Sequence, residues 1–158
     1  VITQAGADVA GGSGWTDRAD GTTVGLVVHD VNATAVMADV AFGADIAAGT
    51  AVSSTLTLPA SSQIINLFLD TMVTPVAGAG TATTCPVTVG TAAAGTQYLS
   101  ATDAIAGGRV ALSFTTAQCA AMADISSNTS VVVTVDPNGT ISTTQGVFRL
   151  TVVYAQKV

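Results

Sequence analysis

The chain has 158 residues, which is enough for one compact domain and too few for two well-packed ones. Charged residues make up 9% of it, against roughly 25% in an average soluble protein, and aromatic residues make up 4%. All ten acidic residues are Asp, and Lys and Arg together number four. Because Glu, Lys and Arg are the usual residues of solvent-facing helices, we expect neither a helical bundle nor a large α/β enzyme.

The net charge of −6 argues against a nucleic-acid partner and against anionic membrane surfaces. The four cations are dispersed along the chain and cannot form the basic stripe that phosphate binding requires: Arg18, Arg109, Arg149 and Lys157. No run of eighteen apolar residues occurs, so we expect no membrane-spanning helix and no membrane partner.

The first part of the chain carries few regular patterns. Residues 1–14 hold four glycines and show no hydrophobic period, so they are predicted to form a flexible arm in front of a single β domain over residues 15–158. A β-branched run at 22–28 predicts a strand. Residues 31–40 have two interpretations: a short helix capped by Asp30, or an irregular connection.

After residue 49 the pattern is that of β structure. The predicted elements, in chain order, are strands at 52–58, 63–72, 87–89 and 109–115, and a helix at 117–123 capped by Thr116. Pro59 ends the first of these strands. The second is a continuous apolar run, which is typical of a buried central strand.

The end of the chain has the clearest pattern. A strand is predicted at 130–136, followed by a turn in which Pro137 presets φ and Gly139 accepts a left-handed conformation. The closing strand, 146–154, alternates strictly, and one face carries Phe148, Leu150, Val152 and Tyr154. About eight short strands separated by turn signals, with one or two short helices, predict an all-β sandwich or barrel.

The residues that could carry chemistry do not form a catalytic pattern. The only His, His29, is followed directly by Asp30 at a strand end, where neighbours point to opposite faces, so we interpret it as a surface or interface residue. Asp17 and Asp20 superficially suggest a calcium loop, but the chain has no Glu to complete one. We therefore predict no enzymatic activity, no cofactor and no metal.

Two features leave alternatives open. Cys85 and Cys119 could form one disulfide or remain as small buried apolar side chains. Trp15, the one large residue outside the strand pattern, could anchor a partner or plug the open end of a barrel. Together with Arg18 and His29 it makes up our candidate interface.

The composition points to protein–protein packing. A polar surface made mainly of hydroxyl and amide groups carries little desolvation cost from unpaired charge, and Lys and Glu are depleted in interface cores. Such a surface suits repeated packing against other proteins, and it also fits an extracellular surface protein.

Three segments resemble the capsid decoration, or cement, proteins of tailed bacteriophages: AGTAVSSTLTL (48–58), VTVGTAAAGTQYLSA (87–101) and GVFRLTVVYAQ (146–156). The resemblance implies a small jelly-roll-like β protein on the outer surface of the virion, assembled in the host cytoplasm. It also implies a partner, the major capsid protein, whose subunits it bridges as a dimer or trimer. That family has no catalytic motif to carry over. Residues 1–14 would then order on a neighbouring subunit.

Two other functions fit the same pattern. One is a secreted bacterial pilin or adhesin domain, with a Cys85–Cys119 disulfide and assembly by strand donation between subunits. The other is a phage tail or fibre component with the same β architecture.

Overall fold

The computed structural model describes residues 14–16, 23–25, 33–41, 49–75, 81–140 and 146–156. The chain divides into two units, residues 1–31 and 32–158. In the first unit, β1 (Gly14–Thr16) pairs antiparallel with β2 (Thr23–Gly25), which lies inside the strand predicted at 22–28. The rest of that strand lies outside the described residues, and so does the predicted arm 1–14, apart from Gly14.

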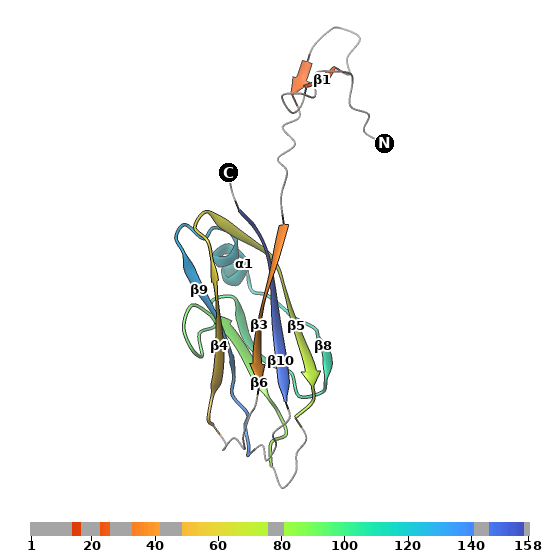
Figure 1. The fold of residues 1–158 in the computed structure, drawn as a ribbon, viewed down its shortest axis with the longest axis vertical. Coiled ribbons are helices and arrows are strands. Elements are labelled where there is room, and N and C mark those ends of the chain that lie inside the picture. Colours follow the sequence, from red (N-terminus) through yellow and green to blue (C-terminus); the bar gives the residue numbers. More distant parts are fainter. Residues whose placement is uncertain are drawn as a thin grey trace. The chain divides into compact units, whose positions relative to one another are not determined.

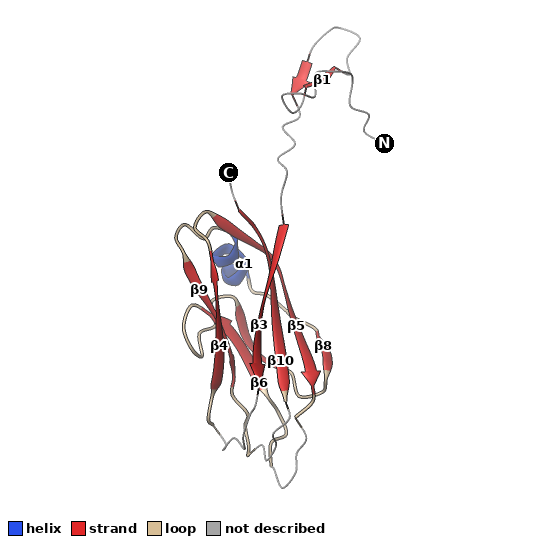
Figure 2. Ribbon diagram, in the orientation of Figure 1, coloured by secondary structure: helices blue, strands red, loops and turns tan. Residues whose placement is uncertain are grey.

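The second unit is a sandwich of two four-stranded antiparallel sheets with one helix (Figures 1 and 2). Its elements are β3 (Ala33–Ala41), β4 (Val52–Leu58), β5 (Ser62–Val73), β6 (Pro86–Gly90), β7 (Leu99–Asp103), β8 (Gly108–Val110), α1 (Thr116–Ala123), β9 (Thr129–Val135) and β10 (Val147–Gln156). The all-β prediction is confirmed, and of the two architectures it allowed the chain forms the sandwich.

The strand order is that of a jelly roll. One sheet has the order β3-β10-β5-β8 and the other β4-β9-β6-β7. The pairs are nested along the chain: β3 pairs with β10, β4 with β9, β5 with β8, and β6 with β7. The chain therefore behaves as one long hairpin rolled up so that its successive pairs alternate between two sheets.

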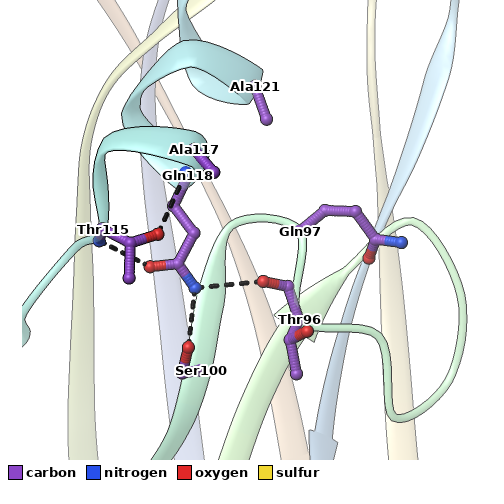
Figure 3. A pocket seen from close by; sticks show the side chains of 7 residues that line it. All are labelled: Thr96, Gln97, Ser100, Thr115, Ala117, Gln118 and Ala121. Carbon is purple, nitrogen blue, oxygen red and sulfur yellow. Dashed lines mark hydrogen bonds between the residues drawn. The ribbon is translucent and has the colours of Figure 1, made fainter.

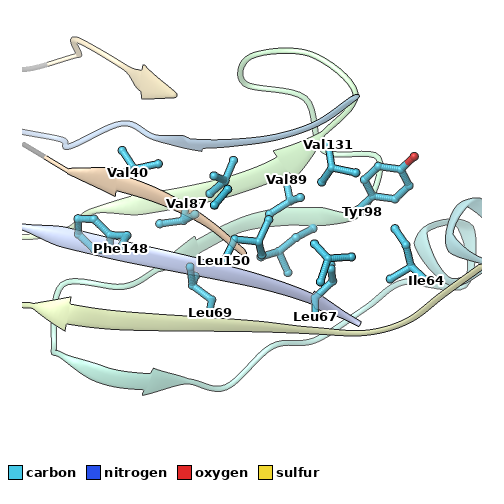
Figure 4. Packing of buried hydrophobic residues seen from close by; sticks show 14 of the residues in the cluster. Val40, Ile64, Leu67, Leu69, Val87, Val89, Tyr98, Val131, Phe148 and Leu150 are labelled. Carbon is cyan, nitrogen blue, oxygen red and sulfur yellow. The ribbon is translucent and has the colours of Figure 1, made fainter. Parts of the chain in front are cut away.

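The core lies between the two sheets (Figure 4). Leu69, Phe148 and Leu150 from the first sheet point toward Val87 and Val89 from the second, and all five side chains are fully buried. These residues are β-branched or large and recur at every second position of their strands, the spacing that places them on one face of a pleated sheet.

The closing strand follows its predicted alternation. Phe148, Leu150 and Val152 are fully buried on the inner face of β10, and Tyr154 is half-buried on the same face. In the interior of its sheet, β10 pairs with β3 on one side and β5 on the other. It is therefore the strand that holds the first sheet together.

Both interpretations of residues 31–40 are wrong, because β3 runs from Ala33 to Ala41. Ala38 and Val40 are buried opposite Leu150 and Phe148 of β10, while Met37 is exposed on the other face. The apolar residues of this segment fit the spacing of a helix as well as that of a strand. The segment forms a strand because it pairs with β10, which lies more than a hundred residues later in the chain.

The prediction for residues 63–72 is correct for the strand and wrong for its burial. β5 is central in its sheet, but only one of its faces is buried. Bulges at Ile65 and Met72 each add one residue relative to β10 and place these side chains on the outer face. An extra residue shifts the alternation of inward-facing and outward-facing positions by one. The apolar side chains of this run therefore lie on both faces of the sheet.

Two element boundaries in the structure differ from the predicted ones. Of the strand predicted at 109–115, only Arg109 and Val110 pair, as part of β8, and the chain then leads into α1 with Leu112 and Phe114 half-buried. Thr115, not Thr116, caps the helix: its hydroxyl accepts a hydrogen bond from the Gln118 backbone N–H at 3.2 Å. Gln118 lies three residues after the cap, which is the spacing of a capping box.

The turn after β9 contains Gly139 for a different reason from the predicted one. Gly139 does not have a positive φ. A Cβ atom at this position would lie 2.6 Å from the backbone nitrogen of Ala82, so the close approach of two chain segments excludes any side chain. Asn138 stabilises the same contact between the two chain segments, because its Oδ1 accepts hydrogen bonds from the N–H groups of Thr83 and Thr84 at 3.0 Å.

Candidate protein-interaction surface

The outer face of the β3-β10-β5-β8 sheet, called the exposed sheet face below, is rich in apolar side chains. Among the described residues, the exposed large hydrophobic side chains are Met37, Ile65, Met72 and Val73, with exposed fractions of 61%, 50%, 52% and 39%. All four lie on β3 or β5. Two of them are the bulge residues of β5, so the irregularities of this strand supply much of the exposed apolar area.

A row of four charged side chains crosses the same face. Asp39 of β3 lies opposite Arg149 of β10, Arg149 opposite Asp70 of β5, and Asp70 opposite Arg109 of β8. The row therefore spans all four strands and alternates in sign from one edge of the sheet to the other. It holds two negative and two positive charges, so its net charge is zero.

Two bidentate ion pairs are formed within this row. Arg149 donates hydrogen bonds from Nε and Nη2 to the two carboxylate oxygens of Asp39, both at 2.8 Å. Arg109 binds Asp70 in the same way, at 2.8 and 2.9 Å. The guanidinium of Arg109 also lies over the ring of Phe68, 4.6 Å from its centroid.

The pairing fixes the charge state of the row. Hydrogen bonds from the guanidinium groups lower the pKa of Asp39 and Asp70 below the usual value, against the opposing effect of partial burial. Hydrogen bonds to the carboxylates raise the pKa values of Arg109 and Arg149. All four groups are consequently charged at neutral pH.

The outer face of the other sheet has a different character. It presents hydroxyl groups, among them Ser53 and Thr55, and loop 91–98 covers part of it. Thr134 is buried there, where its hydroxyl accepts a hydrogen bond from the Ala94 N–H at 3.0 Å and lies 2.8 Å from the Ser53 hydroxyl. The two outer faces of the sandwich are thus unlike, one apolar with a charged row and the other neutral and hydrogen-bonded.

A pocket of about 380 Å³ opens beside the helix (Figure 3). Its lining is neutral and consists of Thr96, Gln97, Ser100, Thr115, Ala117, Gln118 and Ala121. The Gln118 amide nitrogen donates to the Thr96 carbonyl at 3.0 Å and to the Ser100 hydroxyl at 2.9 Å. Its carbonyl oxygen accepts from the Thr115 N–H at 2.9 Å. The amide therefore ties the helix to β7 and the loop before it.

The cysteines are free thiols in contrasting surroundings. Cys85 is fully buried in the core, whereas Cys119 is exposed on α1. Burial, with a smaller effect from the nearby Asp103 carboxylate, raises the pKa of the Cys85 thiol to about 11. Of the two alternatives for this pair, the structure has the unbonded one, and only Cys85 behaves as a buried apolar residue.

The predicted interface residues fall in the first unit. Trp15 lies in β1, where its partner across the two-stranded sheet is Val24. Arg18 and His29 lie outside the described residues, as do Asp17 and Asp20 of the possible calcium loop. The candidate interface of Trp15, Arg18 and His29 therefore stays a prediction.

The charged row was not found from the sequence. Its members are separated by 31 residues or more along the chain, and only the pairing register of four strands brings them into line. The one available signal was that a charged residue stands inside each of three strongly apolar strand patterns: Asp39, Asp70 and Arg149.

Across the described ranges, no group of three or more His, Cys, Asp or Glu side chains could hold a metal ion. No helix in this part of the chain is long and apolar enough to cross a membrane. Comparison with protein-family models, curated proteins and solved structures gives no significant match.

Proposed function

We propose that this chain is a structural virion protein that decorates the outer surface of a tailed-phage capsid and bridges subunits of the major capsid protein. It would act without catalysis, by adding protein–protein interface to the shell. The sequence resemblance stated above suggests this role. The structural observation that carries the proposal is the exposed sheet face, which leaves large apolar side chains in solvent on an otherwise well-packed sandwich and so favours a chain that works within a larger protein assembly.

The charges of this face favour a protein partner. A charge that is buried at an interface without a counter-ion costs several kcal/mol, whereas each cation of the row already has a carboxylate within its own chain. A partner can therefore cover the face without supplying compensating charge at every position. Apolar area with internally paired charges is the pattern expected of a surface that is covered during assembly.

The test is to locate the chain in virions. Purified phage particles from a producing lysate would be analysed by mass spectrometry, and antibodies against the chain would be placed by immunogold electron microscopy. We expect the chain at a fixed ratio to the major capsid protein, with gold on the outside of the head. Absence from purified particles would contradict the proposal.

The alternative functions predict other outcomes. Strand donation requires a sheet that lacks a strand, whereas all four nested strand pairs are present in residues 33–156 as described. This completeness, together with the free thiols, supports the capsid proposal over a pilin-like domain. Polymers that grow with concentration would favour the pilin-like domain instead, and gold on the tail would indicate a tail or fibre component.

A further inference from the structure

We propose that the exposed sheet face is a self-complementary interface, on which a second copy of this chain docks about a two-fold axis parallel to the strands. This inference names the partner of the surface described above. It rests on the proposed function only for the role of the dimer on the capsid, because the contact itself follows from the geometry of the face.

The sign order of the charged row makes the exposed sheet face complementary to a second copy of itself. From β3 to β8 the row reads negative, positive, negative, positive: Asp39, Arg149, Asp70 and Arg109. A half-turn about an axis between two stacked faces and parallel to their strands reverses this order in the second copy. Every charge then meets its opposite: Asp39 faces the partner's Arg109, and Arg149 faces the partner's Asp70.

The same row selects one orientation. A two-fold axis running along the row, across the strands, would place each residue against its own copy and set like charges face to face. Such a juxtaposition of like charges is strongly unfavourable at an interface. Aligned packing of two sheets keeps their strands within about 30° of each other, which is compatible with the favoured axis.

The apolar residues beside the row supply the contact area. In the favoured orientation β10 of one copy lies over β5 of the other. Val147 then lies over Met72 and Val73, and Val153 lies over Asn66 and the adjacent bulge residue Ile65. Three long strands and one short one, at about 4.8 Å spacing and roughly 3.3 Å per residue, give roughly 500 Å² of face per copy. The total of roughly 1,000 Å² is at the lower limit for a specific interface, so the dimer should dissociate on dilution.

The dimer also suits the proposed role. A monomer offers each of its other surfaces once, whereas a two-fold dimer offers every capsid-contacting surface twice. It leaves the hydroxyl-rich outer face of the β4-β9-β6-β7 sheet free on both copies. A bridge between two capsid subunits needs at least two such contacts.

The experiment measures the mass of the full-length protein by multi-angle light scattering over a range of concentrations. We expect the wild type to approach the dimer mass as concentration rises. Asp39→Arg and Arg109→Asp each place like charges against each other twice in the two-fold contact, so each variant alone should dimerise at least tenfold more weakly. An equimolar mixture of the two variants restores opposite charges at both contacts, and its dimerisation should recover.

Controls separate the interface from folding. Thr55→Arg adds a charge on the outer face of the other sheet and should leave the dimer unchanged. Circular dichroism of each variant should show the wild-type β spectrum, because an exposed ion pair contributes little to the stability of a fold.

Three results would overturn the inference: a monomer at every concentration up to about 0.1 mM, a closed trimer, or a mixture no more associated than its two components. The capsid proposal is tested separately by the location of the chain in particles. A dimer that is absent from virions would contradict the function and leave the two-fold contact standing.

Discussion

At the scale of single residues, Gln118 makes a concentrated set of polar contacts. Its buried amide is bonded to Thr96, Ser100 and Thr115, and its backbone N–H closes the capping box. We expect Gln118→Ala to lower the free energy of unfolding by about 2–3 kcal/mol, because three partly buried hydrogen bonds of its amide, each worth about 1 kcal/mol, are lost. Urea denaturation measures this loss. Gln63→Ala, at an exposed position of β5, is the matched control, and equal losses in the two variants would contradict the prediction.

The raised pKa of Cys85 predicts a loss of stability at high pH. An unfolded thiol releases its proton near pH 9, whereas the folded one keeps it to about pH 11. Between these values the folded state binds more protons than the unfolded state. Stability is therefore complete below about pH 9 and falls above it, by at most about 1.4 kcal/mol per pH unit.

A variant isolates this thiol. Cys85→Ala should be destabilised at all pH values by its small cavity, but should lose less additional stability than the wild type between pH 8 and pH 10.5. Some dependence on pH will remain, because burial also raises the pKa of Tyr98. Denaturation curves of the variant and the wild type at pH 8 and at pH 10.5 measure the two losses of stability. An identical pH dependence in variant and wild type would show that Cys85 is not the titrating group.

At the scale of elements, the two faces of β10 predict unequal costs for neighbouring substitutions. Val152 is fully buried, whereas Val153 is half-buried on the exposed sheet face. We expect Val152→Ala to cost about 2 kcal/mol through the cavity it leaves, and Val153→Ala less than about 1 kcal/mol. Chemical denaturation of the two variants at a concentration where the protein is monomeric measures both. Equal costs, or the reverse order, would place β10 in a different register.

The same elements show which strands and buried faces a local sequence pattern can predict. Strict alternation identified β10 and its inner face, because its period of two needs no knowledge of the partner strands. The pattern failed at β3, where Val36, Met37 and Val40 fit a helical spacing as well as a strand. It failed in part at β5, because a bulge adds a residue without any local signal and reverses the face of the residues that follow.

The candidate surface could not be predicted in the same way. Asp39 and Arg149 are 110 positions apart, and nothing near either residue indicates the other. Their contact depends on the register of β3 against β10, and the full row depends on two further registers. The residues suggested by the sequence, Trp15, Arg18 and His29, were selected for their chemistry alone, and they belong to the first unit of the chain, residues 1–31.

At the scale of the whole molecule, the nested topology pairs the first strand of the sandwich with its last strand. β3 begins the second unit and β10 ends it, and the two pair along nine positions. Contacts of such long range must wait for the intervening chain to be ordered, so the protein should fold slowly, in milliseconds to seconds. Stopped-flow refolding measures this rate, and folding within microseconds would contradict the assigned topology.

The same topology predicts opposite effects for truncations at the two ends. Residues 32–158 contain both sheets and the core, so the chain without residues 1–31 should unfold cooperatively with a stability within about 1 kcal/mol of the full chain. Removing residues 146–158 deletes β10, which leaves β3 without a partner in its sheet and β5 paired only with the short β8, and takes Phe148, Leu150 and Val152 out of the core. That variant should show no cooperative thermal transition by circular dichroism. A stable fold without β10, or an unfolded 32–158 fragment, would contradict the division of the chain into a self-contained sandwich closed by its last strand.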